Sequence, residues 1–171
     1  MPVHKILGMD PSFRNWGLAE GLYDTDKKKL FIHRSNVITS LPKKESKYEK
    51  ALSNIRTSNN IRKEVLAFAE NAPYVFVEVP YFSQNEKGAI SLGACLGILG
   101  SLGINFIPVS PDEVKHATIG NSTAKKGEII SRAVELYPNA GWKLRGGKIV
   151  AKYAEHTADA IGAIDAGISK L

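Results

Sequence analysis

Three strand-like runs joined by short connections open the chain, and they constrain its fold more than any other feature. The first run ends at Asp10, the second covers residues 16–23 and the third covers residues 29–38, with a turn at residues 24–27. Apolar, β-branched and aromatic residues bounded by polar turn residues are typical of strands. Short connections join antiparallel neighbours, because a parallel crossover needs a dozen or more residues. The first 38 residues therefore predict a three-stranded antiparallel meander.

After the meander, helical and strand-like segments alternate. Apolar residues at helical spacing run to residue 72, where Pro73 ends the pattern, and a compact apolar strand follows over residues 74–79. The further expected elements are a helix over 89–102, a strand over 105–109, a helix over 123–136, a mobile basic loop over 139–152 and a helix over 156–168. This order predicts an α/β fold with the outline of a ribonuclease H-like mixed five-stranded sheet. Three antiparallel strands lead into two parallel ones, and helices flank the sheet.

The length of the chain and its single cysteine limit its organisation. Its 171 residues show no internal repeat and no linker, which predicts one domain over residues 1–171. Cys95 is the only cysteine, so the sequence excludes an internal disulfide framework and a cysteine-cluster zinc site. We interpret Cys95 and the scattered histidines at positions 4, 33 and 116 as structural or surface residues.

One uncharged stretch raises the alternative of a membrane span. Residues 88–111 include no formal charge and are long enough to cross a bilayer. Five glycines and two prolines within the stretch instead favour a buried helix, a turn at Gly103 and a short strand. In the helix, Gly93 and Gly97 form a small-residue pair that lets another backbone approach closely. We therefore expect no membrane partner.

The chain is basic, and its positive charge is concentrated. The formal net charge is +6, which favours a polyanionic partner such as nucleic acid. Residues 27–63 hold eleven basic and two acidic side chains. This stretch is either a solvated helix face or one flank of a surface that follows DNA phosphates.

Acidic residues in apolar or strand-like surroundings indicate a candidate metal site. Asp10 closes the first strand, Glu78 lies in an otherwise apolar strand, and Asp159 lies in a helix of small and apolar residues. A buried carboxylate is costly unless it is paired, hydrogen-bonded or bound to metal. Carboxylates suit Mg²⁺ or Mn²⁺, and two such ions can support an in-line phosphoryl displacement. His156, three residues before Asp159, is a further ligand, a proton-transfer group or only a helix cap.

A structural interpretation of these acids stays open at this point. A single acid at a strand end is most often an edge or cap residue. Glu155 and Asp165 also lie near Asp159, and periodicity does not exclude Glu155 from the site. The sequence has no G-x-x-x-x-G-K-[ST], H-E-x-x-H or G-x-S-x-G motif, so other common chemistries find no support.

Four separated blocks of the chain form a recognisable set. They are Asp10-Pro-Ser-Phe-Arg14-Asn-Trp-Gly17, Glu78-Val-Pro-Tyr81-Phe82, residues 111–126 with Lys115, Lys125 and Lys126, and His156-Thr-Ala-Asp159-Ala160. Together they resemble the RuvC-type Holliday junction resolvases, nucleases of the ribonuclease H-like superfamily, and they follow that family's order over nearly the whole chain.

The resemblance implies a role for each matched residue. Asp10, Glu78, His156 and Asp159 would hold two Mg²⁺ ions, for which Mn²⁺ can substitute. Lys126 would act in catalysis by stabilising charge in the transition state. The DNA-binding residues would be Arg14, Tyr81, Phe82, Lys115 and Lys125. Tyr81 matches an aromatic that the family uses near the branch point, and Phe82 is its rival for stacking on an unpaired base.

The function expected from this resemblance is Mg²⁺-dependent cleavage of four-way DNA junctions. Paired phosphodiester hydrolysis by a homodimer would leave 5′-phosphate and 3′-hydroxyl ends. One alternative is a ribonuclease H-like nuclease for hybrid or other branched substrates, and another is a non-catalytic module that binds branched DNA. The expected location is cytoplasmic, with the host cytoplasm for a viral member or an organelle interior as alternatives. Nothing in the sequence identifies a branch-migration motor as partner.

Overall fold

The computed structural model describes residues 2–40, 46–81, 85–121 and 123–171. The strands are β1 (Val3–Asp10), β2 (Asn15–Asp24), β3 (Lys29–Thr39), β4 (Tyr74–Glu78), β5 (Ile107–Val109), β6 (Leu144–Arg145) and β7 (Lys148–Ile149). The helices are α1 (Lys47–Ala69), α2 (Glu86–Ser101), α3 (Pro111–Ile119), α4 (Lys126–Leu136) and α5 (Ala151–Ile168).

The central sheet has five strands in the order β3-β2-β1-β4-β5. β1 pairs antiparallel with β2, and β2 pairs antiparallel with β3. β4 pairs parallel with β1 on one side and with β5 on the other. The predicted sheet, three antiparallel strands followed by two parallel ones, is confirmed.

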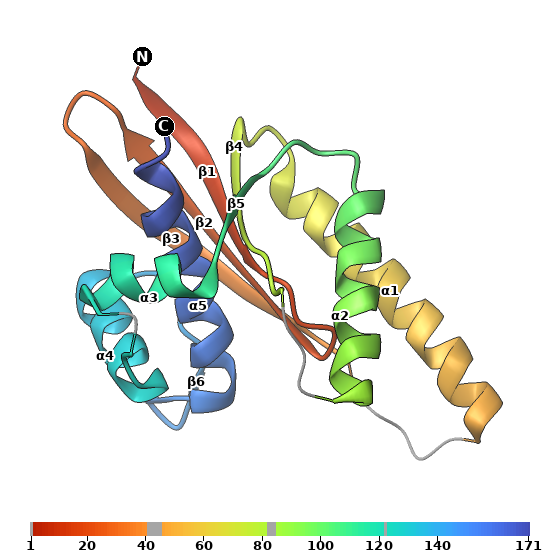
Figure 1. Cartoon of the computed structure of the whole chain (residues 1–171). Helices are drawn as coiled ribbons and strands as arrows, with labels where there is room; N and C mark the ends of the chain where they lie inside the picture. The colour runs from red at the N-terminus through yellow and green to blue at the C-terminus, as the bar shows by residue number, and fades with distance from the viewer. Residues whose placement is uncertain (1, 41–45, 82–84, 122) are drawn as a thin grey trace.

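Helices cover both faces of the sheet. Figure 1 shows α1 and α2 on one side and α3, α4 and α5 on the other. Alternation along β1 explains this arrangement, because Leu7 and Met9 pack in the core under α1 and α2, whereas Ile6 packs in the core under α5. β4 divides in the same way, with Val77 on the first face and Phe76 on the second.

Two glycines let α5 lie directly on the sheet. A Cβ atom at Gly8 would overlap the carbonyl oxygen of Ala160, and one at Gly17 would overlap the carbonyl oxygen of His156. Only hydrogen atoms at these positions leave room for the helix backbone. The close packing fixes the height of α5 above the ends of β1 and β2.

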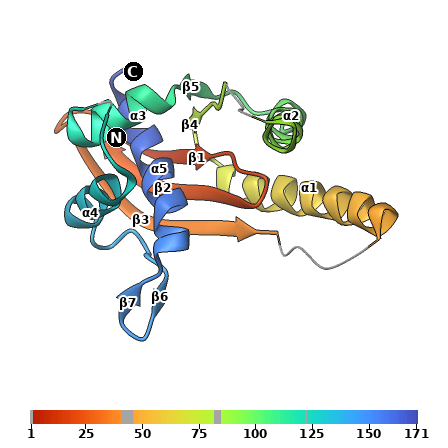
Figure 2. The ribbon, with the colours of Figure 1, turned by 60° about the horizontal axis from the view of Figure 1, so that its bottom comes forward.

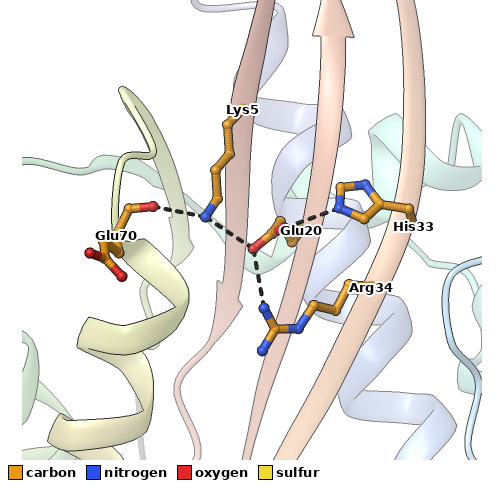
Figure 3. Close-up of polar contacts among 5 residues, drawn as sticks. All are labelled: Lys5, Glu20, His33, Arg34 and Glu70. Carbon is orange, nitrogen blue, oxygen red and sulfur yellow. Dashed lines mark hydrogen bonds and ion pairs between the residues drawn. The ribbon is translucent and has the colours of Figure 1, made fainter.

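An ion cluster around the buried Glu20, which pairs with Leu7 in the middle of β1, ties the end of α1 to the sheet. Glu20 is 8% exposed, and Lys5, His33 and Arg34 surround its carboxylate at 3.2, 3.0 and 3.8 Å. Lys5 also donates a hydrogen bond to the carbonyl oxygen of Glu70, which follows α1 (Figure 3). The cluster accounts for His33 as a structural residue, as the sequence predicted.

The structure corrects several sequence expectations. Residues 111–119 form α3, a helix that we did not predict. α2 begins at Glu86 rather than 89, α4 at Lys126 rather than 123, and α5 at Ala151 rather than 156.

The segment interpreted as a mobile loop over residues 139–152 contains the hairpin β6–β7. Its two central glycines both adopt positive φ, which is the geometry of a tight two-residue hairpin turn. Among the described helices, none is both long and apolar enough to span a bilayer.

Candidate functional site

Asp10 and Glu78 lie side by side where two parallel strands end. In the β1–β4 register, Met9 pairs with Val77, so the next residues along the two strands are Asp10 and Glu78. Side chains alternate between the two faces along a strand, so Asp10 lies on the same face as Ile6 and Glu78 on the same face as Phe76, which is the face that α5 covers. The sheet therefore presents two carboxylates from distant sequence positions on one face, at one edge.

Helix α5 brings the other two predicted ligands to the same edge. His156 and Asp159 are three residues apart, which places them on one side of the helix. His156 Nδ1 lies 2.6 Å from Asp10 Oδ2, across 146 residues of sequence. Helix α5 starts at Ala151, so His156 lies in its second turn and the interpretation as a helix cap is wrong.

The site carries more negative charge than its described surroundings compensate. Burial, followed by repulsion from Asp10 and Asp159, raises the pKa of Glu78 to about 9. Burial, followed by the charges of Asp10 and Glu155, raises the pKa of Asp159 to about 7. The positive charges of His156 and Lys126 oppose this shift only in part. These carboxyls therefore hold protons more tightly than ordinary carboxyls.

The pKa of His156 is also shifted. Burial lowers it, but the hydrogen bond with Asp10 and the charges of Asp10, Glu155 and Asp159 raise it more, so the net shift is upward. A histidine in this position favours the imidazolium form and offsets one of the carboxylates.

These residues fit a hard divalent cation. Glu78 Oε2 is buried and has no hydrogen-bond partner within the described part of the chain. Carboxylate oxygens that repel one another in a buried site are the ligands that Mg²⁺ and Mn²⁺ take. Within residues 2–40, 46–81, 85–121 and 123–171, no three His, Cys, Asp or Glu side chains form a ready-made metal site. The side chains therefore share an edge without being drawn together around a common point.

Two of the predicted lysines lie at this edge. The Lys126 ammonium pairs with the Glu155 carboxylate, and the pair raises the pKa of Lys126. The charge of Lys115, on α3, acts on Glu78 and lowers its pKa in part. The question left open for Glu155 thus has a structural answer: this residue holds Lys126 and contributes to the field at Asp159.

The other predicted DNA-binding residues are spread around the edge. Arg14 lines a groove of about 410 Å³ between α1, α2 and the β1–β2 connection. Tyr81 is 69% exposed, and Lys125 is exposed immediately before α4. Phe82, the rival of Tyr81, lies outside the described residues.

The basic stretch over residues 27–63 does not form one surface. Its described part divides among the β2–β3 turn, at the end of the sheet away from Asp10, strand β3 and helix α1. Lys50 lines the groove beside Arg14, whereas Arg34 stacks on the Phe68 ring, with its guanidinium carbon 3.9 Å from the ring centroid. Arg34 therefore has a packing role, and a contact between DNA phosphates and the members on α1 stays a prediction.

Sequence reasoning missed the residues that position the site. Gly8 and Gly17 admit α5, and no periodic pattern signals such a close approach. Helix α3, which carries Lys115, did have a signal. Ser110 accepts a hydrogen bond from the Glu113 amide, and the Glu113 carboxylate accepts one from the Ser110 amide, which is the S-x-x-E capping box visible in the sequence.

Comparisons with known proteins identify relatives of this chain in sequence and in fold. A crossover junction endodeoxyribonuclease RuvC from Carboxydothermus hydrogenoformans is 34% identical over 129 residues, which cover 73% of this chain and 76% of the relative. The fold matches Thermus thermophilus RuvC in complex with a Holliday junction substrate at a TM-score of 0.66, with 20% identity over 93% of this chain and 92% of that one. It also matches the fowlpox virus Holliday junction resolvase at a TM-score of 0.53, with 11% identity over 98% and 99% of the two chains. No family model matches the sequence.

The structural likenesses establish the fold, and the sequence identity establishes the family. The resemblance that the four blocks carried is confirmed, because the Carboxydothermus hydrogenoformans relative aligns with most of both chains. This chain belongs to the RuvC family of crossover junction endodeoxyribonucleases.

Proposed function

We propose that this protein is a structure-selective endonuclease that resolves four-way DNA junctions. The observation that carries the proposal is the placement of Asp10, Glu78 and Asp159 at one edge of the sheet, close enough to shift one another's pKa values, in a chain of the RuvC family. A carboxylate-rich edge beside Lys115 and Lys126 combines groups for a metal ion with groups for a scissile phosphate. Hydrolysis with a 5′-phosphate and a 3′-hydroxyl as products is the reaction proposed for it.

A nuclease of this family implies a divalent metal requirement, and we assign it to Mg²⁺. Asp10, Glu78, His156 and Asp159 would hold two ions, with Mn²⁺ as a substitute. Metal ions in such a site supply Lewis acidity and activate water for in-line displacement. The buried, unpartnered oxygen of Glu78 supports this assignment, since a cation would supply the interaction that the described protein groups do not.

The protein groups have separate tasks in this proposal. His156 holds the Asp10 carboxylate in place through its Nδ1 atom. Lys126, released from Glu155 by an incoming phosphate, would stabilise the charge that develops on the phosphate oxygens. Lys115, Lys125 and Arg14 would contact the DNA backbone. Tyr81 is exposed enough to stack on an unpaired base beside the cut.

A second copy of the chain is the partner that we propose for α2. Between its polar ends, where Glu86, Lys87 and Ser101 are exposed, the outward face of this helix is apolar or small, with Ala89, Ile90, Gly93, Leu96, Gly97 and Gly100 exposed. A Cβ atom at any of these three glycines would meet nothing within 4 Å, so the surface is open to another backbone. A homodimer with two sites suits the two-fold symmetry of a four-way junction.

The test is cleavage of a synthetic four-way junction with Mg²⁺ by the unmodified chain and by Asp10→Asn. We expect Asp10→Asn to abolish cleavage and to retain junction binding. Asp26→Asn, an exposed residue of the β2–β3 turn, is the matched control and should cleave normally. Equal loss of binding and cleavage in Asp10→Asn would mean that Asp10 supports the fold rather than the chemistry.

A panel of DNA substrates separates the two alternatives. A nuclease that cuts RNA–DNA hybrids or flaps readily and junctions poorly would replace the resolvase proposal. Junction binding by the unmodified chain without any nicking in Mg²⁺ or Mn²⁺ would favour a non-catalytic binding module.

A further inference from the structure

The β6–β7 hairpin projects from the body of the protein beside the N-terminal end of α5. Figure 2 shows it extending away from the sheet and the other helices. Its register pairs Leu144 with Ile149 and Arg145 with Lys148, which leaves Gly146 and Gly147 as the turn. Their φ angles are 58° and 74°, a conformation that glycine adopts without strain.

The hairpin is anchored at its base. The Val150 amide donates a hydrogen bond to the Lys143 carbonyl oxygen at 2.9 Å. Trp142 Nε1 donates to the Tyr137 carbonyl oxygen at 2.8 Å, and the Trp142 ring packs against the core under α5. Lys143 Nζ lies 4.0 Å from the centroid of the Tyr153 ring, on the first turns of α5. The base is thus tied to the rest of the domain while the tip is exposed.

The charge of the hairpin is entirely positive. Residues 139–154 include Lys143, Arg145, Lys148 and Lys152 and no acidic residue. All four are exposed, and Arg145 and Lys148 form no ion pair within the described residues. Directly opposed like charges destabilise a strand pair, so the Arg145–Lys148 pair works against so short a hairpin. A bound polyanion would remove this cost.

The position of the hairpin relates this charge to the catalytic edge. Helix α5 starts at Ala151, two residues after β7 ends, and His156 follows five residues later. Five helical residues rise by about 8 Å. A DNA backbone with a phosphate at Asp10, Glu78 and Asp159 therefore lies close to the base of the hairpin. Because a duplex carries a charge every ~1.7 Å of its axis, neighbouring phosphates are available to the cations of the hairpin.

We propose that the β6–β7 hairpin binds the sugar–phosphate backbone of the DNA arm that leads away from the scissile phosphate. The inference rests on the proposed function for the identity of the ligand as DNA. Arg145 and Lys148 are the phosphate-contacting residues, and Leu144 lies beside them, 59% exposed. The glycine turn keeps the tip narrow, so that both cations reach one backbone.

The first test compares two double variants with the same change of charge. Arg145→Gln/Lys148→Gln removes the two cations of the hairpin strands. Lys28→Gln/Lys29→Gln removes two exposed cations at the junction of the β2–β3 turn and β3, at the far end of the sheet. Affinity for a four-way junction and for duplex DNA is measured against salt concentration in EDTA. Each lost phosphate contact lowers the log–log salt slope by about 0.9, so the hairpin variant should lose about 1.8 and the control nothing.

The outcomes separate the hairpin from the proposed function. Junction preference of the unmodified chain over duplex tests the resolvase proposal. The difference between the two double variants, on either DNA, tests the hairpin. Equal slopes for the two variants overturn the hairpin proposal, as does an unmodified chain that binds neither DNA.

A second test locates the contact. Leu144→Cys labelled with a photoreactive group should crosslink to DNA, and Lys28→Cys with the same label should not. The labelling is selective because Cys95, the only native cysteine, is buried. Crosslinks from residue 144 to nucleotides of one arm support the proposal, and yields no higher than those of the control overturn it.

Discussion

Glu78 combines burial with repulsion from two neighbouring acids, and this has a consequence for stability. Its pKa is raised from 4.5 to about 9 in the folded protein. Between those values the folded metal-free protein holds a proton that the unfolded chain releases. The contribution of the protonated Glu78 carboxyl to the stability of the folded protein is therefore fully present below pH 4.5, and it is lost as the pH rises toward 9. The Asp159 carboxyl acts in the same direction, because its pKa is raised from 3.8 to about 7, and its contribution to stability is lost over that pH range.

We expect the melting temperature of the metal-free protein to fall between pH 6 and pH 8. The decline for one such carboxyl is at most about 1.4 kcal/mol per pH unit. Glu78→Gln should flatten it, and Mg²⁺ should raise the melting temperature more at pH 8 than at pH 6. Thermal denaturation in EDTA and in Mg²⁺ measures both effects. Parallel pH profiles for the two proteins in EDTA would contradict the assignment.

Lys126 and its neighbour Lys125 differ in their surroundings, which allows a matched comparison. Lys126 pairs with Glu155 and lies within reach of the charges of Asp159 and Asp10, whereas Lys125 is exposed before α4. We expect Lys126→Ala to slow single-turnover cleavage by about 10²-fold, the usual cost of one group that stabilises transition-state charge. Junction affinity should change much less.

Lys125→Ala is the control for this comparison. It should weaken binding and leave the cleavage rate of the saturated complex near that of the unmodified chain. Gel shifts beside single-turnover rates measure the two quantities. If Lys126→Ala weakened binding as much as it slowed cleavage, Lys126 would be a DNA contact only.

Between elements, the seating of α5 on β1 and β2 decides whether the site forms. Gly8→Ala places a Cβ atom against the Ala160 carbonyl oxygen, and backbone on both sides leaves little room for adjustment. We expect a loss of about 1–3 kcal/mol in the free energy of unfolding. Urea denaturation followed by far-ultraviolet circular dichroism measures it.

Gly127→Ala on α4 is the matched control, because a Cβ atom there meets nothing within 4 Å. Alanine in an open helical position should stabilise the protein by about 0.5–1 kcal/mol. A destabilisation of similar size in both variants would show that Gly8 has no special packing role.

The elements that sequence analysis predicted best are those with a strong local pattern of apolar residues. The short apolar run Ile6-Leu7-Gly8-Met9, closed by Asp10, predicts a strand from local residues alone, and the structure confirms β1. The β6–β7 hairpin lacks such a signal, since its strands have two residues each and its glycines equally suit a loop. Its formation depends on Trp142 and Val150, which anchor it to the domain.

At the level of the whole molecule, the exposed face of α2 predicts the oligomeric state. Leu96 is 44% exposed on that face, and Leu136 on α4 is 43% exposed elsewhere. We expect the unmodified chain and Leu136→Glu to sediment as dimers and Leu96→Glu as a monomer, because a buried unpaired carboxylate opposes association. Analytical ultracentrifugation distinguishes these states. A monomeric unmodified chain would contradict the dimer proposal.

The sequence by itself determined the order and type of most elements, and it singled out Asp10, Glu78 and Asp159. Periodicity and local environment encode these features, because each depends on residues a few positions apart. It also carried the family resemblance that the relative from Carboxydothermus hydrogenoformans confirms.

Only the tertiary structure decided which acids meet. The β1–β4 register places Asp10 beside Glu78, and the contact between Asp10 and His156 spans 146 residues. The tertiary structure also showed that Glu155 forms an ion pair with Lys126. Strand register and the seating of a helix over glycine arise from packing between distant segments, and no local pattern records that packing.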